Sequence, residues 1–355
     1  MGLVAIYSPE KLCRLPLHDY YERINVPFVE RDGWLVPKRF QAIGDEVMFL
    51  ERGNGIVDFS DHGLLRIEGK DAVDFLHRIS TNDFGNLRPG GSLQTILVNE
   101  KGRMIDSVVV AHKEDYLLMV VSRGAHQQVS QWIEKFIITE DVRVSDLTGK
   151  HLLFAAFHPQ HTLDTSAEGS TSYSFRAKYF DDEVVFYFGD TSAGFPDRIR
   201  PPMYTQVGTD AFEFYCIQHG IPLCKREITG EFNPLDLNLW KQISFSKGCY
   251  IGQEVIARLD TYGKIQRKLC RFRSDGRLLP DTEYRLGLGK EEIGKIVSHV
   301  PDVGNENISI GLAVIKNKYA DAGARYSTAD SAPWVKLEFI FERNEKHDGN
   351  NNNSR

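Results

Sequence analysis

The chain has 355 residues, more than the roughly 100–200 of one typical domain, so two or three hydrophobic cores are expected. Hydrophobic residues make up 41% and charged residues 26%, a globular composition that excludes a fibrous repeat and disorder over most of the chain. The net charge of −6 disfavours a polyanion binder, so no nucleic-acid partner is expected. Charges interrupt even the most apolar stretch, so no membrane partner is expected either.

The cysteines give a second bound on function. They are five in number and show neither a C-x-x-C pair nor zinc-ribbon spacing, so we expect free thiols, no metal site and no resident iron–sulfur cluster. The first residues carry charges and no sustained apolar segment, which disfavours secretion. A cytoplasmic location fits best, and a mitochondrial matrix location would require a transit peptide. The cysteines are Cys13, Cys216, Cys224, Cys249 and Cys270.

Residues 61–149 are predicted to form an α+β domain. An apolar strand at 64–67 precedes an amphipathic helix at 72–79, whose apolar residues recur at i, i+3, i+4 and i+7. A second amphipathic helix is predicted over 125–136, and the two helices would cover one side of a sheet. Turn-like residues separate three apolar runs that predict an antiparallel meander, at 93–98, 104–110 and 116–121, and Val142 with Val144 predict a last strand.

The middle of the chain is expected to join its beginning, with residues 1–60 and 150–260 forming one discontinuous domain. Strands are predicted at 152–157 and 184–187, and the Ser/Thr/Gly-rich segment 165–174 between them is predicted to be a loop. A helix is predicted to open at Thr209-Asp210, with Gly220 as its C′ residue.

The last part of the chain is expected to be all-β. Short alternating runs between 264 and 342, separated by Gly, Pro and Asp, predict a small barrel or sandwich. The tail 343–355 contains four consecutive asparagines and has nothing to bury, so it is expected to be disordered.

The stretch Lys247-Gly-Cys-Tyr-Ile-Gly-Gln-Glu-Val-Ile-Ala-Arg258 carries the strongest functional signal. Ile243 and Phe245 alternate as in a strand, and Val255, Ile256 and Leu259 have helical spacing, so Cys249 is predicted between a strand and a helix N-terminus. Unpaired helix N–H groups and Lys247 would favour a thiolate, which could attack, ligate or be oxidised. Gln253 and Glu254 add polar groups in the first helical turn, and Arg258 is an i,i+4 partner of Glu254.

A purely structural interpretation of this stretch stands beside the functional one. An isolated free cysteine often serves as a small buried hydrophobe, and the two glycines would then only form a turn. The run K-G-C-Y-I-G-Q-E followed by Arg258 nevertheless resembles the signature of the YgfZ-type folate-binding proteins, residue for residue. This resemblance implies functional roles for seven residues, with Cys249 central: Lys247, Gly248, Cys249, Gly252, Gln253, Glu254 and Arg258.

Other segments resemble the related glycine-cleavage aminomethyltransferases. The opening region from Asn54 to Asp83 is similar to theirs, and Asn99-Glu100-Lys101-Gly102 with Asp106 resembles their strand that carries a folate-contacting carboxylate. His62 stands where relatives often have a pocket-lining residue; a lone histidine is otherwise more often structural. The resemblance implies an α+β fold of three domains in a ring around a folate pocket, the third domain being a β-barrel.

The sequence also departs from the transferase pattern. Where the transferases show adjacent acidic residues, this chain has Asp106-Ser107, so only one carboxylate remains. Their Gly-Tyr-Thr-Gly-Glu segment has no counterpart in 184–194, and the charged residues of their following helix are replaced around 212–218. These differences put full transferase chemistry in question.

The resemblance leaves several functions open. The leading hypothesis is a tetrahydrofolate-binding accessory protein that assembles or repairs iron–sulfur clusters in client proteins, with Cys249 as the reactive residue, assisted by Lys247 and Asp106. Asp106, His62, Gln253, Glu254 and Arg258 would then contact the folate. The alternative is a divergent aminomethyltransferase that transfers a one-carbon unit to tetrahydrofolate, and a third reading is a folate-sensing interaction protein in which Cys249 is structural.

Overall fold

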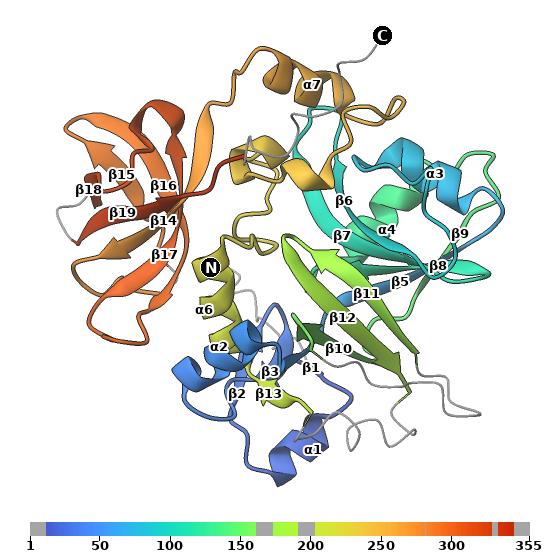
Figure 1. The fold of residues 1–355 in the computed structure, drawn as a ribbon, viewed down its shortest axis with the longest axis horizontal. Helices are drawn as coiled ribbons and strands as arrows, with labels where there is room; N and C mark the ends of the chain where they lie inside the picture. Colours follow the sequence, from blue (N-terminus) through green and yellow to red (C-terminus); the bar gives the residue numbers. More distant parts are fainter. Residues whose placement is uncertain (1–11, 161–172, 191–202, 281, 329–332, 344–355) are drawn as a thin grey trace, which may run out of the picture. The chain divides into compact units, whose positions relative to one another are not determined.

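A computed structural model describes residues 12–160, 173–190, 203–280, 282–328 and 333–343 (Figure 1). The chain forms two compact units, each assembled from three separate segments. Unit 1 comprises Met1–Ala72, Arg88–Ser92 and Val109–Phe212, and unit 2 comprises Val73–Leu87, Leu93–Val108 and Glu213–Arg355. No helix of the described part is long and apolar enough to cross a membrane.

Unit 1 begins with a small sheet and two short helices that the sequence analysis did not predict. The strands β1 (Cys13–Arg14), β3 (Trp34–Pro37) and β2 (Phe28–Arg31) lie in that order, with β1 parallel and β2 antiparallel to β3. The helices are α1 (His18–Arg23) and α2 (Ile43–Arg52). Tyr21, Trp34 and Tyr204 share one hydrophobic core with Ile56 and Phe154, which belong to the next sheet.

The second sheet of unit 1 combines strands from the beginning and the middle of the chain. Its order is β11-β12-β10-β4-β13, in which β4 and β13 pair in parallel and the other pairs are antiparallel. An aromatic cluster of Phe59, Phe157, Phe186 and Phe212 stabilises the unit. The strands are β4 (Gly55–Asp58), β10 (Leu152–Phe157), β11 (Tyr173–Tyr179), β12 (Asp182–Gly189) and β13 (Thr205–Val207).

The third sheet has the order β6-β7-β8-β5-β9 and confirms the predicted strands of this region. Gly102 N–H donates to the Asn99 carbonyl at 2.9 Å and closes the predicted turn between β6 and β7. The helix α4 (His126–Glu134) packs against β5 and β9, and α3 (Ala72–Ile79) follows β5. The strands are β5 (Gly63–Glu68), β6 (Ser92–Val98), β7 (Met104–His112), β8 (Tyr116–Val121) and β9 (Arg143–Asp146).

The predicted helix near 209–220 is confirmed as α6 (Thr209–His219), with Gly220 at a φ of +67° directly after it. Two 3₁₀ turns, η1 (Pro234–Leu237) and η2 (Trp240–Gln242), lead to α7 (Gln253–Thr261). The prediction of a strand at Ile243–Phe245 is wrong. Ile243 N–H bonds back to the Trp240 carbonyl and Ser244 N–H to the Thr81 carbonyl, so this backbone has no ladder partner.

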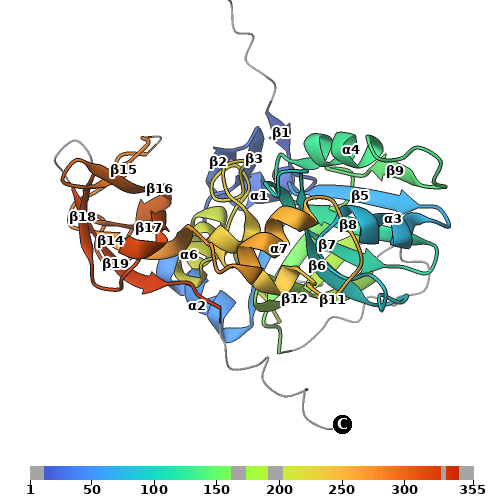
Figure 2. The ribbon, with the colours of Figure 1, turned by 90° about the horizontal axis from the view of Figure 1, so that it is seen from above.

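The remainder of unit 2 is a closed six-stranded barrel of order β14-β17-β16-β15-β18-β19, visible in Figures 1 and 2. Cys270, Phe272, Ala313, Val335 and Leu337 are fully buried in its core. The predicted β-barrel is therefore confirmed, although two short strands were not predicted. The strands are β14 (Arg267–Ser274), β15 (Arg285–Leu288), β16 (Glu291–Pro301), β17 (Ser309–Lys316), β18 (Arg325–Thr328) and β19 (Trp334–Ile340).

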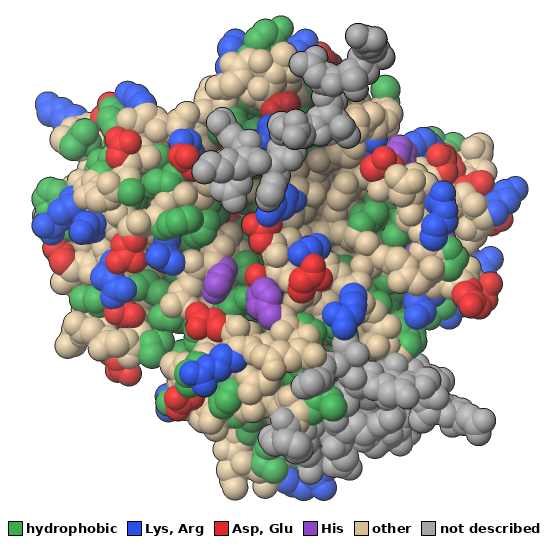
Figure 3. All heavy atoms as spheres, viewed as in Figure 1, with side chains coloured by type: hydrophobic (Ala, Val, Ile, Leu, Met, Phe, Trp, Pro, Cys, Tyr) green, Lys and Arg blue, Asp and Glu red, His purple; other side chains and the backbone are tan. Residues whose placement is uncertain are grey.

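Two predicted irregular segments fall mostly outside the described residues. Of the predicted loop 165–174, only Tyr173 and Ser174 are described, and both belong to β11. Of the predicted tail 343–355, only Arg343 is described. Basic and acidic side chains are interspersed among the described residues on the face that Figure 3 shows.

Candidate functional site

The Lys247 side chain is buried in unit 2 and holds a chain segment that is distant in the sequence. Its Nζ donates hydrogen bonds to the carbonyls of Ser80 (2.8 Å) and Asn82 (2.7 Å), and to the carbonyl of His77. Burial lowers the pKa of Lys247 to about 8, and the charge of Asp83 opposes this shift only in part. Lys247 therefore fixes the turn that follows α3, which is a structural task.

A network of buried polar side chains extends from this turn toward β7. The Thr81 hydroxyl donates to the Gln242 carbonyl at 2.7 Å, and the Gln242 side-chain amide donates to Gln94 Oε1 at 3.2 Å. Gln94 Nε2 in turn donates to the Ser107 hydroxyl at 3.0 Å. Gln94 and Gln242 are 148 residues apart in the chain. The network thus fixes β7 at Ser107, whose side chain points to the sheet face opposite to that of its neighbour Asp106.

Asp106 lies in β7 and its side chain is fully buried. Such a carboxylate costs free energy unless hydrogen-bond donors satisfy it, and Ser107 rather than a second acid follows it in the strand. The carboxylate oxygens of Asp106 can accept hydrogen bonds from the N–H donors of a flat ring. Because Asp106 is buried, such a ligand would have to replace the groups that now cover it.

The segment that contains Cys249 meets the turn between β6 and β7. Gly252 precedes α7 with a φ of +79°, and a Cβ at this position would lie 2.5 Å from the Asn99 carbonyl oxygen. Gly102 also approaches Val255, since a Cβ there would lie 3.2 Å from Val255 Cβ. These two glycine-dependent approaches bring the motif against the hairpin that carries Asp106.

Cys249 is exposed, whereas Cys216 and Cys270 are buried. It precedes α7 by four positions, so the prediction of a helix after it is confirmed, while the predicted strand before it is absent. Glu254 Oε1 accepts from Arg258 at 2.5 Å, as the i,i+4 spacing predicted, and both side chains are largely exposed. Cys249, Glu254 and Arg258 thus lie on an accessible surface rather than in a closed pocket.

His62 belongs to unit 1, unlike the other predicted site residues. Its Nδ1 lies 2.8 Å from Asp61 Oδ1, and its ring stacks on Phe59 with the centroids 3.9 Å apart. Asp61 is fully buried and also pairs with Arg123. Burial favours the neutral acid, yet Arg123 and His62 outweigh this effect and hold the pKa of Asp61 below its usual value. The pair fixes the orientation of the imidazole.

Sequence reasoning missed most of the polar groups described above. Gln94 offered a signal, because it interrupts the apolar run of β6, but Gln242 and Arg123 offered none before the fold was known. No group of three or more His, Cys, Asp or Glu side chains suited to a metal ion occurs among the described residues.

Comparison with known proteins agrees with this architecture. Residues 17–161 match the family of the GCVT N-terminal domain. The solved structure of the glycine cleavage system aminomethyltransferase T from Bartonella henselae superimposes with a TM-score of 0.78, covering 92% of this chain and 97% of that one at 18% sequence identity. The predicted α+β aminomethyltransferase-like fold is therefore confirmed.

Two relatives match along most of their length. A chloroplastic candidate transferase of Arabidopsis thaliana is 29% identical, over 91% of this chain and 79% of its own. An aminomethyltransferase of Caldanaerobacter subterraneus subsp. tengcongensis is 25% identical, over 89% of this chain and 91% of its own. Residues 17–161 are thus similar to the GCVT N-terminal domain family, and the fold is aminomethyltransferase-like.

Proposed function

We propose that this protein binds tetrahydrofolate and transfers a one-carbon unit to it, as an aminomethyltransferase does. The GCVT family implies tetrahydrofolate binding, and the relatives named aminomethyltransferase support this reaction class. The observation that carries the proposal is the fully buried carboxyl group of Asp106 in β7.

The reaction places definite demands on these residues. One folate nitrogen attacks a methylene carbon held between sulfur and an amino group, and ammonia leaves. A second folate nitrogen then replaces the sulfur, which leaves as the carrier thiol, so that the methylene group ends up bound to both folate nitrogens. Asp106 would accept a hydrogen bond from the folate and orient the attacking nitrogen. Ser107 replaces the second acid of the transferases, so a single carboxylate must both bind and orient the folate. Gln94 and Gln242 would keep the strand in position through their hydrogen bonds.

Binding is tested first, by calorimetric titration of the reduced protein with tetrahydrofolate. Asp106→Asn keeps the size of the side chain and removes its charge, so we expect affinity to fall at least about tenfold, the equivalent of one charge-assisted hydrogen bond. Asp115→Asn, at an exposed position, is the matched control and should bind like the wild type. Equal affinity of all three proteins would exclude Asp106 from the folate site.

Transfer is tested separately, by ammonia release from an aminomethylated lipoyl-carrier protein in the presence of tetrahydrofolate. The proposal expects release that requires folate and that Asp106→Asn abolishes or strongly reduces. A protein that binds folate without releasing ammonia would keep the binding part of the proposal and lose the transferase part.

A second candidate is the YgfZ-type role in iron–sulfur cluster assembly or repair. It is favoured by the exposure of Cys249, which leaves the thiol of the K-G-C motif open to a client protein. Gln253, Glu254 and Arg258 would contribute to this surface, while the buried Lys247 would support the fold. In cells, Cys249→Ser should then lower the activity of iron–sulfur enzymes, while Cys13→Ser, at another exposed thiol, should not. Unchanged enzyme activities in both variants would remove this candidate.

A contribution of His62 to folate contact is part of the same proposal. His62→Ala should weaken tetrahydrofolate binding in the titration described above, whereas an unchanged affinity would confine His62 to its contacts with Asp61 and Phe59. The cytoplasmic location of this protein stays a prediction. One of its relatives is named as chloroplastic.

A further inference from the structure

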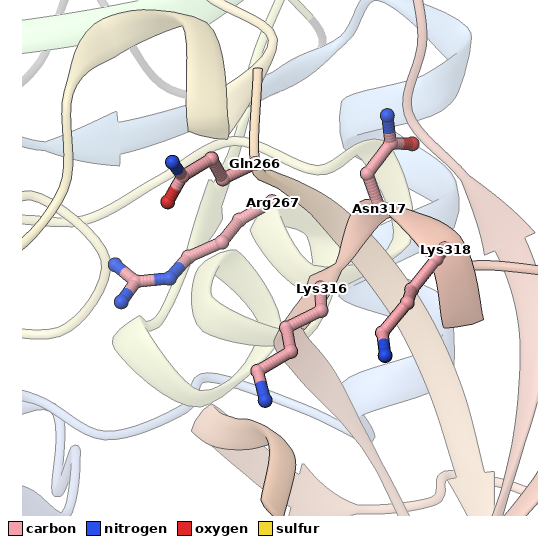
Figure 4. A pocket seen from close by; sticks show the side chains of 5 residues that line it. All are labelled: Gln266, Arg267, Lys316, Asn317 and Lys318. Atoms are coloured by element: carbon pink, nitrogen blue, oxygen red, sulfur yellow. The ribbon is translucent and has the colours of Figure 1, made fainter. Parts of the chain in front are cut away.

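The wall of the barrel carries an open hollow of about 540 Å³ that none of the functions above uses. Its lining contains three cations, two amides and no carboxylate, and Figure 4 shows these side chains on neighbouring strand ends. Lys316 and Lys318 extend in the same direction in that view. The lining residues are Gln266, Arg267, Lys316, Asn317 and Lys318.

The backbone forces these cations together. Arg267 at the start of β14 and Lys316 at the end of β17 are directly opposed in the antiparallel ladder. Asn317 N–H donates to the Gln266 carbonyl at 2.8 Å and closes the corner, after which the short turn η3 (Asn317–Tyr319) adds Lys318. Like charges directly opposed across two strands are destabilising. A local rule that is broken without compensation is typical of a functional site.

Carboxylates of the described residues offset the repulsion among these three cations only in part. Glu291 Oε1 lies 3.3 Å from Lys316 Nζ and 3.1 Å from Lys318 Nζ, so one carboxylate serves two lysines. A hydrogen bond from Tyr319, followed by those from Lys318 and Lys316, lowers the pKa of Glu291 to about 2, so it stays ionised. The three cations and this one carboxylate leave the hollow with a net positive charge.

Arg267 is partly buried and differs from the two lysines in its partners. Its guanidinium lies over the Phe232 ring, 5.6 Å from the centroid, and within the described part of the chain it forms no ion pair. It acts on the buried Asp236 only through the longer-range charge interaction. The aromatic contact holds the guanidinium in place without neutralising it, and a preordered guanidinium favours bidentate binding of carboxylate or phosphate.

We propose that this hollow binds a small anion that carries at least two carboxylate or phosphate groups. One anionic group would contact Arg267 and a second would lie between Lys316 and Lys318, in competition with Glu291. The amides of Gln266 and Asn317 would supply further donors at the rim. A volume of this size suits a small molecule. The inference is independent of the folate proposal, because it concerns other residues and another part of unit 2.

The test is calorimetric titration of the full chain at low salt with two probes. Inorganic pyrophosphate represents a phosphate ligand and tri-γ-glutamate represents an oligocarboxylate, while acetate controls for a single charge. We expect saturable binding of one polyanion in the millimolar range or tighter, and affinity that falls as salt increases. The probe that binds more tightly shows whether the hollow prefers phosphate or carboxylate groups.

Three variants decide whether the hollow is the site. Arg267→Ala should weaken binding about tenfold, because it removes a charge-assisted contact. Glu291→Gln should strengthen it, since it frees both lysines. Arg325→Ala removes another exposed barrel arginine, which pairs with Asp275, and should have no effect. Equal losses in Arg267→Ala and Arg325→Ala, weaker binding by Glu291→Gln, or no saturable binding of either probe at about 10 mM would overturn the proposal.

Discussion

At the scale of single residues, the K-G-C motif combines two different tasks. Lys247 is buried and donates to three carbonyls, whereas Cys249, two residues later, is exposed. The sequence suggested that Lys247 acts on the thiol through its charge. In the structure its ammonium group is engaged by the turn around Ser80, so the motif lysine supports the fold and the motif cysteine is the residue available for chemistry.

Replacing this lysine tests its structural role. Lys247→Met keeps the aliphatic stem but leaves the carbonyls of His77, Ser80 and Asn82 without their donor. We expect a loss of about 2–4 kcal/mol in the free energy of unfolding, measured by urea denaturation. Lys290→Met, at an exposed turn position, should change it by less than about 0.5 kcal/mol. A similar, small effect of both substitutions would show that the buried bonds contribute little.

Asp58 provides a pH-dependent prediction. Burial raises its pKa from 3.8 to about 6, although hydrogen bonds from Ser60 and Tyr21 oppose the shift. The folded state therefore binds this proton more tightly than the unfolded state, so the contribution of Asp58 to stability is present below about pH 4 and is lost as the pH rises through about 6. Asp58→Asn removes this titration while keeping groups that can bond to Tyr21 and Ser60.

The free energy of unfolding of Asp58→Asn, measured relative to the wild type, should consequently rise between pH 5 and pH 7.5, by about 1–2 kcal/mol. Urea denaturation at both pH values gives this difference, and Asp115→Asn serves as an exposed control with a pH-independent difference. A relative stability of Asp58→Asn that stays constant or falls over this range would contradict the raised pKa.

At the scale of elements, the approach of α7 to the β6–β7 turn depends on Gly252 as well as on Gly102. Gly252→Ala must adopt a φ near +79° and place its Cβ against the Asn99 carbonyl, so we expect a loss of about 1–3 kcal/mol and a shift of the helix start. Gly248→Ala is the matched control, since nothing lies within 4 Å of its Cβ position.

Two measurements report this change. Urea denaturation gives the loss of stability, and the rate of Cys249 alkylation reports the altered surroundings of the thiol. Gly248→Ala should leave the stability nearly unchanged. If Gly252→Ala unfolds at the wild-type urea concentration, the close contact between α7 and the turn is not required by the fold.

The elements that sequence patterns predicted well are those with local signals. The meander from β6 to β8, the helices α3, α4 and α7, and four of the six barrel strands follow the apolar periods of their own residues. The alternation of Ile243 and Phe245 led to the wrong prediction of a strand. In the structure Ile243 is buried, Phe245 is exposed, and their backbone pairs with no strand. The network between Gln94 and Gln242 could not be predicted, since its two ends meet only after the chain has folded over 148 residues.

At the scale of the whole molecule, the two units share the strand β7. Its residues up to Val108 belong to unit 2, and those from Val109 onward belong to unit 1. Both units are also assembled from three discontinuous segments, so neither can be released by cutting the chain once. A strand with a continuous backbone cannot lose half of its pairing without loss of support for the other half, so we expect the units to unfold together.

This cooperativity can be measured because each unit has its own tryptophans. Trp34 and Trp132 belong to unit 1, while Trp240 and Trp334 belong to unit 2. In a Trp34→Phe, Trp132→Phe background, fluorescence reports unit 2 alone. Phe154→Ala, at a fully buried position of unit 1, should cost about 3–5 kcal/mol. If the two units are coupled, Phe154→Ala should lower the urea midpoint of the unit 2 fluorescence. The decrease should equal the decrease in the midpoint of the circular dichroism signal.

The background variant without Phe154→Ala supplies the reference midpoint for both signals. A fluorescence midpoint that stays at this reference while the circular dichroism transition shifts or splits would show that unit 2 folds independently.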